Sequence, residues 1–190
     1  MNKKLAAALS GSAVLMLVLS GCGGEDGDEK ANAWAKQVCD KWAPQLKKIE
    51  TANADLKRVS GESTKPDEVQ RTDSAAFQAQ ADAYKAMSAA VAQAGVPPTK
   101  DGQATKDAAV KGFDAASKAY TDLKAKVDAL DPKDQGKFAD GLKEIAAGIT
   151  EAQKGSTDAY GQLKKAGLDQ AMNTQKGCKV TLAPTASPAK

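Results

Sequence analysis

The spacing of apolar residues constrains the fold of this chain more than any other feature. From Ala31 onward they recur every three or four positions, which places them on one face of an α-helix. Ala, Lys, Gln, Glu and Leu, all good helix formers, dominate the same part of the chain. No segment has the period-two alternation that predicts a β-strand. The sequence therefore predicts an all-α protein.

Glycine and proline interrupt this pattern and divide it into helices. The first predicted helix ends at the segment Ser60–Pro66, and the second begins near Thr72 or Ser74, both plausible caps, and stops at Gly95. The third has the clearest heptad spacing. Its apolar residues share two heptad positions, Phe113, Tyr120 and Val127 on one and Ala116, Leu123 and Leu130 on the other.

The fourth predicted helix has Asp131 as its N-cap and Pro132 at its first position, and Gly167 ends it. A short helical turn, Leu168–Asn173, follows. Long helices with short connections pack most simply side by side in alternating directions. The predicted fold is thus an antiparallel four-helix bundle over residues 31–180, which includes a short C-terminal helical turn.

The start of the chain predicts export. Two lysines in Met1–Lys4 precede an apolar run of 16 residues, Leu5–Ser20. This is the layout of a secretory signal peptide, and the run is shorter than the roughly 20 residues of a membrane-spanning helix. The run ends in Leu19-Ser20-Gly21-Cys22, which resembles the lipobox of bacterial lipoprotein precursors. The chain as a whole is similar in style to the small secreted lipoproteins of actinomycetes, most of which have no assigned activity.

The resemblance implies that Cys22 receives a diacylglyceryl thioether and becomes the first residue of the mature protein. Two acyl chains, such as palmitate, hold a protein stably on a membrane because each buried CH₂ contributes about 0.8 kcal/mol. The expected location is the outer face of the cell membrane, with the N-terminal lipid as the membrane contact. The alternative is an ordinary secretory signal, or an uncleaved anchor, with Cys22 there by chance.

Removal of a signal peptide of residues 1–21 changes the charge of the chain. The full sequence has 27 basic and 24 acidic residues, and loss of Lys3 and Lys4 leaves a net charge of +1. A nearly neutral protein lacks the basic surface that nucleic acid binding requires, so no nucleic acid partner is expected. Residues 22–30, rich in Gly and acids, predict a flexible tether. The Pro-, Thr- and Ala-rich residues 181–190 predict a disordered tail.

Two cysteines remain for the helical domain. Cys39 and Cys178 form an even pair in an exported protein, where disulfides persist. We predict that they form a disulfide between the first helix and the C-terminal segment. A catalytic thiol is the alternative, but it needs an activating base, usually histidine, and the sequence has none.

The absence of histidine excludes histidine-based catalytic triads and histidine metal ligands. The segment Asp131–Leu142 resembles a calcium loop, but Lys133 and Gln135 replace expected ligands and Leu142 stands where the bidentate Glu belongs. The sequence has no phosphate-binding loop or nucleophile elbow. We therefore expect no catalytic residue, no metal and no cofactor.

Glycines and tryptophans mark two further features. Gly141, Gly148 and Gly155 lie seven residues apart, on one stripe of the fourth helix; we call them the glycine stripe. It indicates either close packing of a neighbouring helix or a groove for a ligand or partner. Trp34 and Trp42 share a face of the first helix, where both are core residues or Trp34 is an anchor at the membrane interface.

The sequence thus favours a non-enzymatic lipoprotein of the cell envelope that acts as a binding or scaffold module, with its ligand or protein partner unspecified. A carrier of a small apolar ligand between helices is the second hypothesis, and an envelope hydrolase the third. A cavity lined by Met87, Phe113, Tyr120 and the glycine stripe would favour the carrier, whereas a tightly packed core would favour the scaffold.

Overall fold

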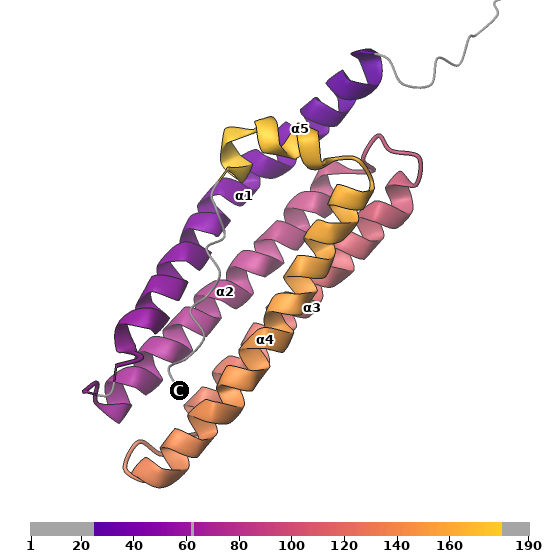
Figure 1. The fold of residues 1–190 in the computed structure, drawn as a ribbon. Helices are drawn as coiled ribbons and strands as arrows, with labels where there is room; N and C mark the ends of the chain where they lie inside the picture. Colours follow the sequence, from indigo (N-terminus) through magenta and orange to yellow (C-terminus); the bar gives the residue numbers. More distant parts are fainter. Residues whose placement is uncertain (1–24, 62, 180–190) are drawn as a thin grey trace, which may run out of the picture.

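The fold, taken from a computed structural model that describes residues 25–61 and 63–179, is helical throughout its described part (Figure 1). No β-strand occurs in those residues, which confirms the all-α prediction. The elements in chain order are α1 (Glu25–Val59), α2 (Pro66–Ala94), α3 (Gly102–Asp128), α4 (Gln135–Lys165), α5 (Asp169–Thr174) and the 3₁₀ turn η1 (Lys176–Cys178).

The four long helices pack in sequence order, α1 on α2, α2 on α3 and α3 on α4, and successive helices run in opposite directions (Figure 1). This confirms the predicted four-helix bundle. The first and last long helices, α1 and α4, would close the bundle, but no described Cα atom of one lies within 8 Å of a Cα atom of the other. These two helices meet instead through the rings of Trp42 and Tyr160, whose centroids are 5.2 Å apart. The bundle is therefore more open between α1 and α4 than between its other neighbours.

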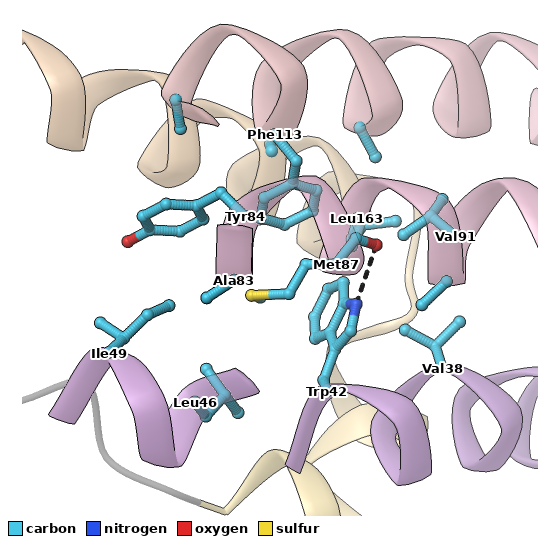
Figure 2. Packing of buried hydrophobic residues seen from close by; sticks show 14 of the residues in the cluster. Val38, Trp42, Leu46, Ile49, Ala83, Tyr84, Met87, Val91, Phe113 and Leu163 are labelled. Atoms are coloured by element: carbon cyan, nitrogen blue, oxygen red, sulfur yellow. Dashed lines mark hydrogen bonds between the residues drawn. The ribbon is translucent and has the colours of Figure 1, made fainter. Parts of the chain in front are cut away.

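Aromatic side chains from different helices meet in the core (Figure 2). The Trp42 ring lies edge-on to Phe113, and its Nε1 donates a hydrogen bond to the carbonyl oxygen of Met87 at 3.1 Å. Trp34 is also buried, and its Nε1 donates to the carbonyl oxygen of Gly95; both tryptophans are thus core residues. Buried core residues in the described chain run from Trp34 to Met172, so a chain that begins after Cys22 retains all of them.

The heptad residues of α3 lie where the spacing predicts. Phe113, Ala116, Tyr120, Leu123 and Val127 are all buried. Leu130, which the same pattern includes, is only partly buried because α3 ends at Asp128.

The N-terminus of α1 differs from the prediction of a flexible tether. Residues 25–30 are helical, because α1 begins at Glu25. Its first turns carry Asp26, Asp28 and Glu29. Carboxylates near a helix N-terminus are stabilised by the helix dipole, so the acidic composition supports helix formation there. Cys22 and the predicted tail, residues 181–190, lie outside the described residues.

Two other helix starts differ from the predictions. Helix α2 begins at Pro66 rather than near Thr72 or Ser74, because proline suits the first helical position, where its missing N–H is not needed. Helix α4 has Asp134 as its N-cap, with a side chain that accepts a hydrogen bond from the backbone N–H of Lys137. Asp131 accepts from the N–H of Lys133 in the preceding loop instead.

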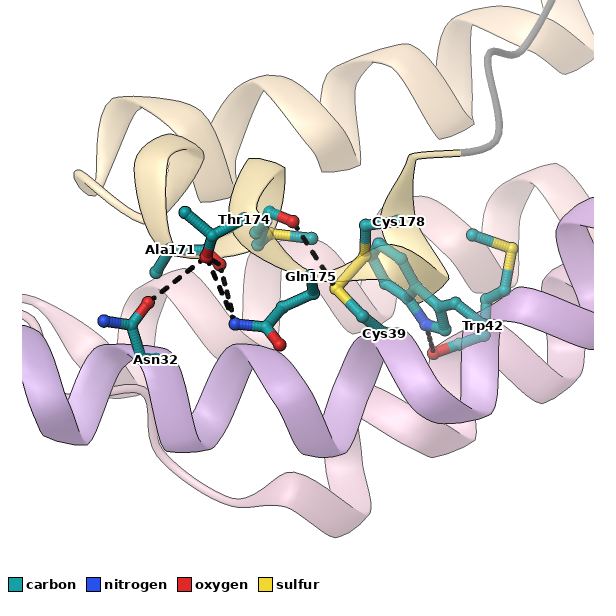
Figure 3. Close-up of a disulfide and its surroundings, with 9 residues drawn as sticks. Asn32, Cys39, Trp42, Ala171, Thr174, Gln175 and Cys178 are labelled. Carbon is teal, nitrogen blue, oxygen red and sulfur yellow. Dashed lines mark hydrogen bonds between the residues drawn. A yellow bond between two sulfur atoms is a disulfide. The ribbon is translucent and has the colours of Figure 1, made fainter.

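The C-terminal elements fold back onto the first helix. Gly167, with φ of 85°, lies just after α4, as predicted, and lets the chain turn into α5. The disulfide between Cys39 and Cys178, with Cα atoms 5.0 Å apart, then joins η1 to α1 (Figure 3). A Cβ at Gly177 would collide with the carbonyl group of Cys39. The disulfide prediction is confirmed, and glycine is required beside it.

Candidate functional site

The site most suited to binding is a cavity of about 670 Å³ between α1, α2 and α4. It lies on the side where α1 and α4 do not pack backbone to backbone. Its lining residues on α2 run from Pro66 to Gln80, and those on α4 from Gln135 to Ile149. At 1.5 Å per helical residue, each wall is about 20 Å long. Both the elongated shape and the volume suit a small ligand, since ligand pockets are typically about 300–1,000 Å³.

Apolar side chains from all three helices form most of the cavity wall. Phe77 and Phe138 contribute aromatic rings from α2 and α4, and both are buried in the folded chain. The aliphatic residues of the wall are Leu56 and Val59 on α1, Val69 on α2, and Leu142, Ile145 and Ile149 on α4. An apolar surface of this extent favours a ligand with an apolar body.

Two polar side chains of α2 are buried beside this apolar wall. Asp73 is 8% exposed, and its burial raises the pKa of the carboxyl group from 3.8 to about 6. Gln80 is 1% exposed. The two residues are seven positions apart, which places them on the same face of α2, two turns from each other. The cavity thus has a polar portion formed from one helix face.

Gln80 leaves one acceptor unused. Its Nε2 donates to the Oδ1 of Asn53 on α1 at 2.9 Å, but its buried Oε1 has no hydrogen-bond partner. A buried polar atom without a partner costs about 1–3 kcal/mol. Gln80 lines the cavity, but this oxygen is itself covered, so a ligand would reach it only through a shift of the amide side chain.

The remaining titratable groups of the wall are Tyr120, Lys57 and Lys143. Tyr120 of α3 is buried and its side chain is hydrogen-bonded to Gln153; burial raises the pKa of its phenol. Lys57 and Lys143 are exposed, and the Nζ of Lys143 lies 3.0 Å from the carboxylate of Asp140. The lysines thus carry positive charge in the solvated part of the cavity, while Asp73 is withdrawn from solvent.

The cavity is not where the carrier hypothesis places it. Met87 and Phe113 are completely buried in the core and do not line the cavity (Figure 2). Of the three residues that the carrier hypothesis names beside the glycine stripe, only Tyr120 lines it. The aromatic core fills the interior at that level of the bundle. The open space lies further along, between Asn53 on α1 and Ile149 on α4.

The glycine stripe faces α3 and the loop that follows α3, not the cavity. A Cβ at Gly155 would lie 3.1 Å from the backbone nitrogen of Ala116, and one at Gly148 would lie 2.7 Å from Cδ2 of Leu123. At Gly141 it would collide with the side chain of Leu130. Of the two interpretations of the stripe, close helix packing describes this geometry.

Gly112 of α3 completes this contact and is absent from the sequence-based prediction. A Cβ there would lie 2.8 Å from the Cβ of Ala159 and 2.9 Å from the carbonyl oxygen of Gly155. Gly112 precedes Phe113 in the α3 heptad pattern, and no second glycine lies seven residues away to mark it. A pattern within one helix therefore cannot identify it.

The cavity residues do leave a signal in the sequence. Asp73, Gln80 and Met87 are seven apart, as are Phe77, Tyr84 and Val91, so both sets lie on the buried side of α2. Asp73 and Gln80 are therefore polar residues at core positions of a heptad pattern. Gln80 lies inside the helix predicted from the sequence and Asp73 lies at its start, so the heptad pattern alone marks both as polar residues on the buried face.

The part of the chain that the structure describes contains no group of three or more His, Cys, Asp or Glu side chains that could hold a metal ion. None of the helices within it is both long and apolar enough to cross a membrane. Comparisons with known proteins add no assignment: no protein-family model, curated protein or solved structure matches the chain.

Proposed function

We propose that this chain is a lipoprotein, anchored by a lipid on Cys22 to the outer face of the cell membrane, whose helical domain binds a small ligand in the cavity between α1, α2 and α4. The anchoring rests on the lipobox resemblance of Leu19–Cys22. The binding rests on one observation, the cavity with its buried, unpaired Gln80 Oε1. The domain is a binding module without a catalytic role.

The chemistry of the cavity wall supports a ligand. Apolar side chains that line a cavity lack the dispersion contacts that packing against other protein atoms would give them. The buried carboxyl of Asp73 and the unpaired oxygen of Gln80 add to this loss. A ligand that fills the apolar space and bonds to these two groups would offset all three terms. A pure scaffold gains nothing from such a cavity, and a core of apolar residues would serve it better.

The disulfide suits a binding domain of this openness. It joins η1 to α1 near Trp42, at the level where α1 and α4 meet through their side chains (Figure 3). The cavity begins further along α1, at Asn53. The covalent link thus holds the closed end of the bundle and leaves the open end to admit a ligand.

A matched pair of tryptophan substitutions tests the cavity. Ala146 lines it, whereas its neighbour Ala147 is exposed on the same helix. The chain from Gly23 to Lys190 is titrated with decanol by calorimetry. The unsubstituted protein and Ala147→Trp should bind decanol, and Ala146→Trp should not, because the indole would occupy the cavity. Equal binding by both variants, or none by the unsubstituted protein, would contradict the proposal.

A further inference from the structure

We infer that the polar portion of the cavity, formed by Asp73 and Gln80, selects a ligand with a positively charged, hydrogen-bond-donating head group, such as a primary ammonium, on an apolar body. This inference rests on the proposed function and specifies the class of ligand. It follows from which polar groups the cavity buries and which it leaves in solvent.

Asp73 supplies a negative charge that no described residue neutralises. It takes part in no ion pair or hydrogen bond with another described residue, and it is the only carboxylate among the described residues of the cavity wall. Desolvation is the cause of its perturbed titration. A cation that enters the cavity would stabilise the charged carboxylate there, since opposite charges attract more strongly away from water.

Gln80 adds a second acceptor on the same face of α2, an oxygen that is covered in the folded chain and that a ligand would reach through a shift of the amide side chain. Its amide nitrogen is already bonded to Asn53, so the group left over is the Oε1 acceptor. The two buried side chains therefore both offer acceptors. An ammonium group carries three donors and no acceptor, which matches this pair in both charge and hydrogen-bonding character.

An anionic head group matches the cavity less well. Its partners would be Lys57 and Lys143, which are exposed. Pairs between exposed charges are weak because water and salt screen them. Asp73 would repel the same anion from within the wall. The buried charge therefore decides the preference, and the exposed lysines do not reverse it.

Proton binding should compete with the cationic ligand. The charged and titratable groups that share the cavity with Asp73 are Lys57 of α1, Lys143 of α4 and Tyr120 of α3. With a pKa of about 6 in the unliganded protein, Asp73 is mostly ionised at pH 7.5 and mostly protonated at pH 5. Affinity for an ammonium ligand should fall about tenfold between these two values, while affinity for a neutral ligand should change little.

Three ligands with the same alkyl chain separate the head group from the body. Decylamine, decanol and decanoic acid are titrated into the chain from Gly23 to Lys190 at pH 7.5. Decylamine should bind at least about tenfold more tightly than decanol, as expected for a hydrogen bond to a charged group. Decanoic acid should bind more weakly than decanol.

The Asp73→Asn variant tests the source of the preference, and Asp82→Asn, an exposed carboxylate on the same helix, is its control. Asp73→Asn should lose the preference for decylamine over decanol, whereas Asp82→Asn should retain it. Equal binding of all three ligands by the unsubstituted protein, or tightest binding of decanoic acid, would overturn the inference and leave the cavity proposal standing. If none of the three ligands bound, both the inference and the cavity proposal would be overturned.

Discussion

The contact between α3 and α4 at Gly112 gives a prediction with an internal control. Replacing Gly112 by alanine adds a Cβ that would lie 2.8 Å from the Cβ of Ala159 and 2.9 Å from the carbonyl oxygen of Gly155. Both distances are well inside van der Waals contact, and the second involves backbone, which cannot move without shifting α4. Gly161 lies in α4 with nothing within 4 Å of an added Cβ.

Both substitutions gain the same helix propensity, about 1 kcal/mol for alanine over glycine. The gain is unopposed at Gly161, so Gly161→Ala should stabilise the protein by about that amount. At Gly112 the added methyl group must separate two packed helices, and overpacking of this kind typically costs about 1–3 kcal/mol. The difference between the two variants isolates the packing term, because the propensity cancels. It should be about 1–3 kcal/mol, with Gly112→Ala the less stable.

Urea denaturation of the chain from Gly23 to Lys190, followed by circular dichroism, measures both free energies of unfolding. Gly148→Ala should fall between the two variants, because its added Cβ meets only the end of the Leu123 side chain. If Gly112→Ala stabilised the protein as much as Gly161→Ala, the close packing of α3 on α4 would be refuted.

Three further predictions concern the anchor, the disulfide and the cavity. Cys22→Ala should release the protein from the membrane fraction or leave it unprocessed, and a mature, membrane-bound variant on cell fractionation would contradict the lipobox interpretation. Reduction of the Cys39–Cys178 disulfide should lower the melting temperature while the helical signal persists at low temperature, since the sequence separation of 139 residues corresponds to roughly 5 kcal/mol by the chain-entropy argument; an unchanged melting temperature would contradict it. Asp73→Asn should stabilise the unliganded protein by about 1–3 kcal/mol at pH 7.5. It should have no effect near pH 3, because a carboxyl whose pKa is raised on folding lowers stability only where it must ionise; an effect of the same size at both values in urea denaturation would refute the burial of that charge.

The helices and their pairing were predictable because the bundle is specified by local patterns. Apolar spacing and the breaks at Ser60–Pro66, Gly95, Asp131-Pro132 and Gly167 define the four helices, and short connections require antiparallel neighbours. The disulfide followed from the cysteine count and from the prediction of export. The helix starts were less predictable, because Pro66 and Asp134 begin helices through backbone geometry that several nearby residues could also have supplied.

The cavity could not be predicted because it depends on how far apart two helices lie. The distance between α1 and α4 depends on how α2 and α3 pack between them. No residue pattern within a single helix predicts that distance. The sequence does mark Asp73 and Gln80 as polar residues at core positions of α2. It does not show that space lies beside them, so the same two residues would equally fit a buried pair bonded to a neighbouring helix.

The glycine stripe is a second case in which a pattern within one helix does not predict what packs against it. The spacing of Gly141, Gly148 and Gly155 correctly places them on one face of α4, but close packing and an open groove both use small residues. The facing residues decide between them, and these come from α3 and the loop after it. Contacts across helices therefore carry the information that separates a packed surface from a binding site.

Chemical-shift mapping by nuclear magnetic resonance shows where on the protein a ligand binds. Decylamine is added stepwise to isotopically labelled protein from Gly23 to Lys190 at pH 7.5. The account predicts saturable shifts that cluster at Asn53, Asp73, Gln80 and Ile145, with the packed core around Met87 little affected. Shifts scattered over the exposed helix faces, or none at saturating decylamine, would contradict the claim that the cavity between α1, α2 and α4 is a ligand-binding site.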